Sequence, residues 1–211
     1  MIIDLDEARP IATGGKRDIY LHPHDPGLVI KVISARRQNK QNARSWRERL
    51  YKPRYEWEFI REIKTVYRAS LLRHEGEQMP IISASGLVQT SRGLGLSAEK
   101  ITDADGGLAP RLSSFLDQQD FEAIYLPKLN RFIQDVFRFR IVASDLNCSN
   151  IVYSGSEERF VAIDGFGSRT LIPIMVWSRK ANERQLNATI EKKIANRTRL
   201  KWNKEARQFE L

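Results

Sequence analysis

Short apolar runs in the first hundred residues predict an antiparallel sheet. Residues 11–21 read as two strands joined by a Gly-containing loop, and 28–33 form a third strand with one lysine among five aliphatic residues. A turn rich in Pro and Gly, 22–27, separates these elements. Residues 81–90 and 94–101 flank a Ser-Arg-Gly turn, which indicates a hairpin. Together these runs predict a small sheet in the N-terminal half.

Helical periodicity appears between the strands and after them. In 55–74 and in 121–138 apolar side chains recur at three- and four-residue steps, which is typical of an amphipathic helix. Asp120 is placed to cap the second of these helices. A shorter helix is expected at 111–118. The second helix leads the chain into a predicted hairpin.

That hairpin consists of two apolar runs, 151–153 and 160–163, around a polar turn that contains Gly. Further on, Leu186, Ile190 and Ile194 form a narrow stripe, which predicts a helix that docks on the C-terminal half. The overall pattern predicts an α+β protein with an N-terminal part, 1–102, and a mostly helical part, 103–211.

Composition restricts the environment and the partners. The chain has 211 residues, with 35 basic and 26 acidic side chains and a net charge of +9, which favours anionic partners. Its single cysteine, Cys148, rules out an intramolecular disulfide and suits a reducing cytoplasm. No His neighbours Cys148, so we do not expect a nucleophilic thiol. No signal peptide or membrane span is expected, because no apolar run approaches about 20 residues.

Basic residues concentrate in two segments. Eight of them lie in 34–54, where a solvated helical face is the ordinary explanation. The tail, 176–211, has ten basic and four acidic residues, a net charge of +6. A docking helix is the default interpretation of the tail, and a contact with nucleic acid or anionic lipid is the alternative.

Candidate chemistry lies at the predicted C-terminal hairpin. Asp145 precedes the hairpin, Asn150 opens it and Asp164 closes it, so the fold of the hairpin brings the three side chains to one end. Their oxygens can hold a divalent cation and steer a hydroxyl. The spacing matches the catalytic loop of kinases, Asp-x-x-x-x-Asn, followed by a metal-binding Asp before Gly.

Other polar residues follow the order of a kinase N-terminal lobe. Gly14 and Gly15, with Lys16 beside them, can approach phosphates closely, although an ordinary β-turn also explains two glycines. Lys31 either points from an edge strand to solvent or lies in a cleft and pairs with a glutamate. Glu62 is the preferred partner for Lys31, with Glu58 one helical turn away as the reserve. Backbone groups near Glu99, after the second hairpin, are placed to recognise a purine edge.

The ordered motifs together resemble those of the bacterial PhoP regulatory network YrbL family, whose members look like minimal protein kinases. The resemblance covers about residues 8–170. The matching stretches are TGGKRDIYLHP (13–23), VIKV (29–32), GLVQT (86–90), GLGL (93–96), EKITDADG (99–106) and SDLNCSNIV (144–152).

This resemblance implies a compact two-lobed, protein-kinase-like fold that uses ATP and Mg²⁺. Lys31 would bind the α- and β-phosphates and Glu62 would orient it. Asp145 would accept the proton of the substrate hydroxyl, while Asn150 and Asp164 would hold Mg²⁺. The two glycines would cover the phosphates.

Three departures from the kinase pattern narrow this expectation. Ala143 and Ser144 stand where kinases have His-Arg, Asp164 is followed by Gly-Phe-Gly, and no Ala-Pro-Glu follows Gly167. These changes argue against activation by phosphorylation and leave the acceptor open among small molecules, glycans and proteins. The hypotheses are therefore a phosphotransferase, a non-catalytic regulator with the same fold, and a basic module that binds anions or nucleic acid.

Overall fold

The computed structural model describes residues 2–167 and 174–211. The chain forms two compact units. Unit 1 comprises Met1–Ile63 and Ser83–Lys100, and unit 2 comprises Lys64–Ile82 and Ile101–Leu211. The division into 1–102 and 103–211 stays a prediction.

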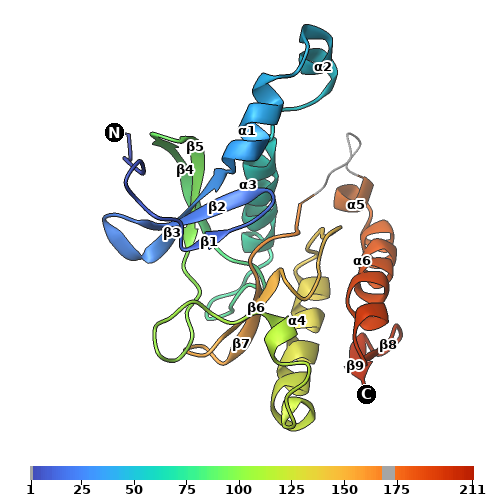
Figure 1. The fold of residues 1–211 in the computed structure, drawn as a ribbon. Helices are drawn as coiled ribbons and strands as arrows, with labels where there is room; N and C mark the ends of the chain where they lie inside the picture. The colour runs from blue at the N-terminus through green and yellow to red at the C-terminus, as the bar shows by residue number, and fades with distance from the viewer. Residues whose placement is uncertain (1, 168–173) are drawn as a thin grey trace. The chain divides into compact units, whose positions relative to one another are not determined.

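Unit 1 is built on the antiparallel sheet that the apolar runs predict. Its strand order is β1-β2-β3-β5-β4, so β3 lies at the centre (Figure 1). The strands are β1 (Ala12–Thr13), β2 (Arg17–His22), β3 (Asp25–Ile33), β4 (Ala84–Thr90) and β5 (Gly93–Glu99). The predicted turn over 22–27 is too long: β3 already includes Pro26 and Gly27, and its Asp25 pairs with His22. Pro is tolerated there because it stands next to the strand's first residue.

Three helices lie between β3 and β4 in the sequence. They are α1 (Ala35–Asn42), α2 (Trp46–Tyr51) and α3 (Trp57–Ser70). The basic segment thus forms α1 and α2. Ser45 begins α2 with a capping box that Glu48 completes, and Pro53 lies in the break before α3. Phe59 of α3 is fully buried against Ile33 and Leu96 of the sheet.

Unit 2 contains the long helix predicted at 121–138, before the hairpin of 151–163, but the helix starts later than predicted. A π-helical turn (Phe121–Tyr125) precedes α4 (Leu126–Arg138), and Asp120 makes no side-chain capping bond. Pro127 explains the start of α4, because a proline without an N–H fits the first turn of a helix. The helix expected at 111–118 shrinks to a 3₁₀ turn (Leu112–Ser114).

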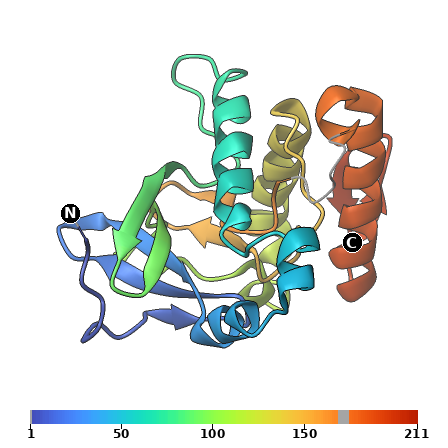
Figure 2. The same cartoon turned by 90° about the horizontal axis from the view of Figure 1, so that it is seen from above.

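The remaining elements of unit 2 are a hairpin, two helices and a final small hairpin. They are β6 (Ile151–Ser154), β7 (Arg159–Ala162), α5 (Ile174–Trp177), α6 (Arg179–Lys193), a 3₁₀ turn (Ala195–Arg197), β8 (Lys201–Asn203) and β9 (Gln208–Glu210). Figures 1 and 2 show α4 and α6 side by side. Leu186 and Ile190 of α6 are buried, which confirms the predicted docking helix. The structure therefore confirms the α+β class with an antiparallel N-terminal sheet. In the described part of the chain, none of the helices has both the length and the apolar character that crossing a membrane requires.

Candidate active site

A buried ion pair lies at the centre of unit 1. Lys31 projects from β3, and its Nζ lies 3.3 Å from Oε2 of Glu62 on α3. The two residues are only 5% and 2% exposed. The edge-strand alternative for Lys31 is therefore wrong, because β3 is the central strand and β2 and β5 pair with it on either side. Of the two candidate glutamates, Glu62 is the partner.

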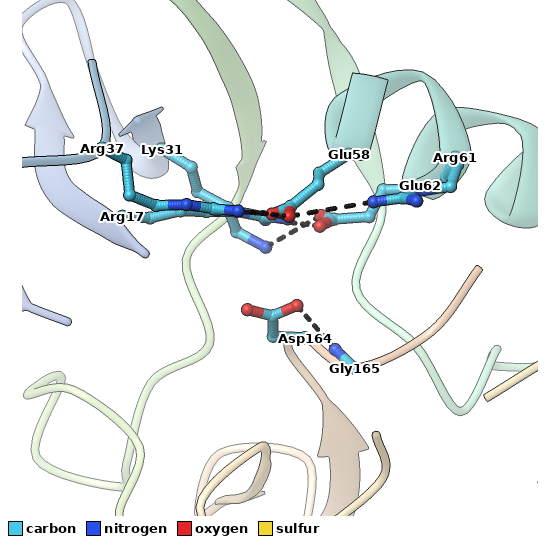
Figure 3. A network of polar contacts seen from close by, with 8 residues as sticks. All are labelled: Arg17, Lys31, Arg37, Glu58, Arg61, Glu62, Asp164 and Gly165. Atoms are coloured by element: carbon cyan, nitrogen blue, oxygen red, sulfur yellow. Dashed lines mark hydrogen bonds and ion pairs between the residues drawn. The ribbon is translucent and has the colours of Figure 1, made fainter. Parts of the chain in front are cut away.

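Arg17 is a second cation that pairs with Glu62, and no motif in the sequence pointed to it. It opens β2, is 7% exposed, and its Nη1 pairs with Oε1 of Glu62. Glu58 instead pairs with Arg17 and Arg37, as Figure 3 shows. Arg61 lies 3.8 Å from the same Glu58 carboxylate. These contacts bring four cations to the carboxylates of Glu58 and Glu62.

The ion pairs with Arg37 and Arg17 lower the pKa of the Glu58 carboxyl. Burial alone would raise that pKa, but the hydrogen bond from Arg37 and the charges of Arg37 and Arg17 outweigh burial and lower it below 4.5. A lowered folded-state pKa means that the ion pairs contribute fully above the unfolded-state pKa. The contribution is lost as the pH falls through the folded-state value.

We therefore expect Glu58→Gln to lower the free energy of unfolding at neutral pH, with a difference from wild type that shrinks once the pH falls below about 4.5. Urea unfolding curves of both proteins at neutral and acid pH measure this difference. A difference that stays constant with pH would contradict the ionised pairing of Glu58.

The predicted phosphate loop is the turn between β1 and β2. The Gly14 N–H donates to the carbonyl of Arg17 at 2.9 Å, and the carbonyl of Lys16 accepts from Ser34 N–H at 3.1 Å. All three loop residues are exposed. A Cβ added to Gly15 would meet no atom within 4 Å, so packing does not require glycine at that position. The role of Gly14, Gly15 and Lys16 toward phosphates stays a prediction.

Glu99 ends β5, and the chain itself uses the backbone donors at this point. The Glu99 N–H donates to the Ser83 carbonyl at 3.0 Å, and the Lys100 N–H donates to the Gly27 carbonyl at 2.8 Å. The Glu99 carboxylate also accepts from Ser83 N–H at 3.4 Å. Recognition of a purine edge here stays a prediction, and it would have to use other backbone groups than these two N–H donors.

In unit 2 the hairpin brings the three predicted polar side chains to one end, as expected. Asn150 Nδ2 donates to the carbonyl of Asp145 at 2.8 Å, and the Ile163 N–H donates to the carbonyl of Asn150 at 2.9 Å. The Asp145 N–H donates to the Gly165 carbonyl at 3.1 Å. Oδ1 of Asp164 accepts from the Gly165 N–H at 2.6 Å (Figure 3). These bonds to main-chain groups hold Asp145 next to Asn150 and next to Gly165, the residue that follows Asp164.

Gly165 gives a physical reason for one departure from the kinase pattern. Its φ is +87°, and a Cβ at this position would lie 2.3 Å from the Asp145 carbonyl oxygen. No side chain fits so close to the backbone, and a positive φ also favours glycine. The bulky residue of this segment therefore comes one position later, where Phe166 is buried and bridges to Ala143.

Lys193 is a second residue that sequence reasoning missed. It lies in the last turn of α6, and its Nζ is 2.7 Å from Oδ1 of Asp145, 48 residues earlier in the chain. Asn147 Nδ2 approaches the same oxygen at 3.4 Å. In the sequence, Lys193 is one of ten basic residues of the tail and shows no feature that distinguishes it from the others. A cation thus fixes the Asp145 carboxylate in the folded chain.

The structure gives less support to a nucleophilic thiol or a cluster of several metal ligands in this loop. Burial raises the pKa of the Cys148 thiol, which disfavours the nucleophilic thiolate. Among residues 2–167 and 174–211, no three His, Cys, Asp or Glu side chains group as metal ligands do. The role of the Asn150 amide oxygen and the Asp164 carboxylate as cation ligands stays a prediction.

Comparisons with known proteins agree with the ordered motifs. A family model described as PhoP regulatory network protein YrbL matches residues 3–198. YrbL of Escherichia coli (strain K12) and YrbL of Shigella flexneri are each 32% identical over 187 residues, covering 84% of this chain and 80% of theirs. The crystal structure of a mutant Mycobacterium tuberculosis PknI kinase domain aligns with 86% of this chain and 70% of that domain. That alignment has a TM-score of 0.48 and 16% identity.

Proposed function

We propose that this chain, which belongs to the PhoP regulatory network protein YrbL family, is an ATP- and Mg²⁺-dependent phosphotransferase acting on a hydroxyl acceptor. The observation that carries the proposal is the buried pair of Lys31 and Glu62. Burial of two charges costs more free energy than burial of apolar residues of the same size, so such a pair is weak evidence for a stabilising role. A role in binding phosphate groups accounts for the buried Lys31–Glu62 pair better.

The residues of unit 1 supply positive charge to phosphate groups. Glu62 fixes Lys31 at 3.3 Å and thereby limits the positions of its ammonium group. Arg17 shares the same carboxylate, so two buried cations meet at one glutamate. Pre-organised cations stabilise the charge on phosphate oxygens without reorganisation during the reaction. Lys31 is accordingly the residue to which we assign phosphate binding.

The residues of unit 2 handle the acceptor proton and the cation. Asp145 would accept the hydroxyl proton. Asn150 donates through its nitrogen, so its amide oxygen is the atom that would face a cation, together with the Asp164 carboxylate. These are hard oxygen ligands of the kind that Mg²⁺ prefers, so the donor set fits the ion. When bound, Mg²⁺ neutralises charge on the phosphate oxygens.

Lys193 has a defined part in this proposal. Its ammonium group holds Oδ1 of Asp145, which orients the carboxylate. In protein kinases the Asp that accepts the hydroxyl proton lies in the catalytic loop. In this chain the orienting cation comes from α6 rather than from the loop itself.

A non-catalytic regulator with a kinase-like fold is the alternative, and the same Lys193 contact favours it. One oxygen of Asp145 already accepts from Lys193 and from Asn147, so the carboxylate has bonds that a substrate hydroxyl would have to share. This alternative predicts nucleotide binding without transfer to any acceptor, including water.

The experiment that tests the nucleotide and cation site of this proposal is calorimetric titration of ATP, with and without Mg²⁺, on the full chain; turnover of ATP separates the phosphotransferase from the regulator. We expect binding that requires Mg²⁺, and about 10- to 100-fold weaker binding in Lys31→Met and in Asp164→Asn, since each loses a charge-assisted contact. Asp164→Asn retains an oxygen for the Gly165 N–H, so it spares the local backbone.

Matched controls are Lys64→Met and Asp117→Asn, which make the same changes at exposed positions. Both controls should bind ATP as the wild type does. If wild type binds no ATP with or without Mg²⁺, or if Lys31→Met and Asp164→Asn bind as their controls do, the proposal fails.

A further inference from the structure

Residues 35–54, which we call the α1–α2 segment, carry an unusual concentration of positive charge. The segment contains eight basic residues and one acidic residue, Glu48. In α1, Arg36 and Lys40 are exposed and stand four residues apart, on one side of the helix. Arg47 and Arg49 of α2 are exposed as well. The segment therefore presents several cations to solvent.

The same segment exposes large apolar side chains. Trp46 is 68% exposed, Leu50 71% and Tyr51 83%, and no residue of α2 is buried. A helix of a globular protein normally buries its apolar residues against a core. In unit 1, α2 instead lies at the end of α1 that points away from the sheet (Figure 1). Its apolar residues have no function in the core of this unit.

Local bonds hold α2 in this exposed position. The capping box between Ser45 and Glu48 fixes its start. Arg49 donates to the carbonyl of Asn42 at 2.9 Å, which ties α2 back to the end of α1. Arg44 donates to the Pro53 carbonyl at 3.0 Å. The exposed apolar residues are thus presented on an ordered support.

We propose that the α1–α2 segment docks on the surface of an anionic lipid bilayer. Trp and Tyr side chains favour the headgroup region, where an apolar ring and a polar atom are both accommodated. An aliphatic side chain such as Leu50 gains free energy by entering the acyl boundary. The surrounding Arg and Lys side chains are attracted to lipid phosphates.

The chemistry of the segment favours lipid over nucleic acid. Aromatic rings can stack on bases, but the aliphatic side chain of Leu50 gains little from a base or a sugar–phosphate backbone. Arg47 lies over the Trp46 ring, with its guanidinium carbon 5.4 Å from the ring centroid, which pairs a cation with an interfacial ring. This docking is independent of the proposed phosphotransfer, because it uses none of the residues assigned to that reaction.

Co-sedimentation of the full chain with phosphatidylcholine vesicles, with and without phosphatidylglycerol, tests the proposal. We expect binding only to the anionic vesicles, weakening as salt is added. Tryptophan fluorescence should shift to shorter wavelength on binding, and Trp46→Phe should lose most of that shift. The shift follows insertion of this ring directly, apart from any effect on the fold.

The decisive variant is Trp46→Ala/Leu50→Ala, compared with Trp177→Ala/Leu71→Ala. The control removes a Trp and a Leu of similar exposure, 74% and 68%, outside the segment. We expect the first variant to lose at least about tenfold in vesicle affinity, because two apolar side chains no longer enter the interface. The control should bind as wild type does. Equal binding by the two variants would overturn the proposal.

A second comparison in the vesicle experiment tests the role of charge. It sets Arg36→Glu/Lys40→Glu on α1 against Lys64→Glu/Arg68→Glu on α3. Both pairs are exposed, and each pair is four residues apart in a helix. We expect an affinity loss of about tenfold or more in the first variant and clearly less in the second. Failure of wild type to bind anionic vesicles, or retention on DNA or RNA without binding to vesicles, would overturn the lipid assignment.

Discussion

Asp145→Asn should lower the rate of phosphoryl transfer by about 10²- to 10⁴-fold, the usual contribution of a positioned general base. The amide cannot accept the hydroxyl proton, yet it keeps the shape of the side chain. Its partner Lys193 has a side chain that is 31% exposed, so water can solvate the ammonium group once the carboxylate is gone. ATP affinity should therefore stay close to that of the wild type. The measurement is ATP turnover, first with water and then with a panel of hydroxyl acceptors.

Two further variants make this result interpretable. Asp117→Asn changes an exposed aspartate of the same unit and should leave turnover unchanged. Lys193→Met removes the cation that orients Asp145 and should reduce turnover less than Asp145→Asn does, since the carboxylate itself remains. Turnover by Asp145→Asn at the wild-type rate would exclude Asp145 as the base. No turnover by wild type with any acceptor, despite ATP binding, would favour the regulator.

Glu62→Ala should lower the stability of unit 1 by about 3–5 kcal/mol, the usual result of removing one member of a buried ion pair. The substitution leaves Lys31 and Arg17, which are 5% and 7% exposed, without their shared carboxylate. Arg17 keeps its contact with Glu58, but the desolvation of both cations loses the carboxylate that they share. Hydrogen exchange of the β3 and β5 amides measures this effect in unit 1 itself, because these strands carry the sheet.

Glu58→Ala provides the comparison for this prediction. The Glu58 side chain is 17% exposed, against 3% for Glu62, so its partners recover more hydration when it is removed. We expect a smaller loss of stability than for Glu62→Ala. Replacing the three buried charges together, with Arg17→Met, Lys31→Met and Glu62→Leu, should restore much of the stability while removing ATP affinity. A loss below about 1 kcal/mol in Glu62→Ala would show that water or other groups compensate the cations.

Local patterns in the sequence determined much of this protein. Short apolar runs between turn residues placed the strands, and three- and four-residue periodicity placed α3, α4 and α6, because each pattern depends only on neighbours within one element. The order of Lys31, Glu62, Asp145, Asn150 and Asp164 could also be read directly. The hairpin geometry was sufficient to predict that the last three lie close together. Cap details were less predictable: Asp120 was the right type of residue, but the π turn and Pro127 set the start of α4.

Only the tertiary structure decided which charges meet. Arg17 reaches Glu62, and Lys193 reaches Asp145 across 48 residues, because sheet pairing and the docking of α6 bring distant segments together. No periodicity in the sequence encodes such contacts. The exposure of Trp46 and Leu50 could not be predicted either, since an apolar residue in a helix is ordinarily expected to face a core. The sequence therefore determined the elements and the order of the polar residues, while packing determined their partners and the residues left at the surface.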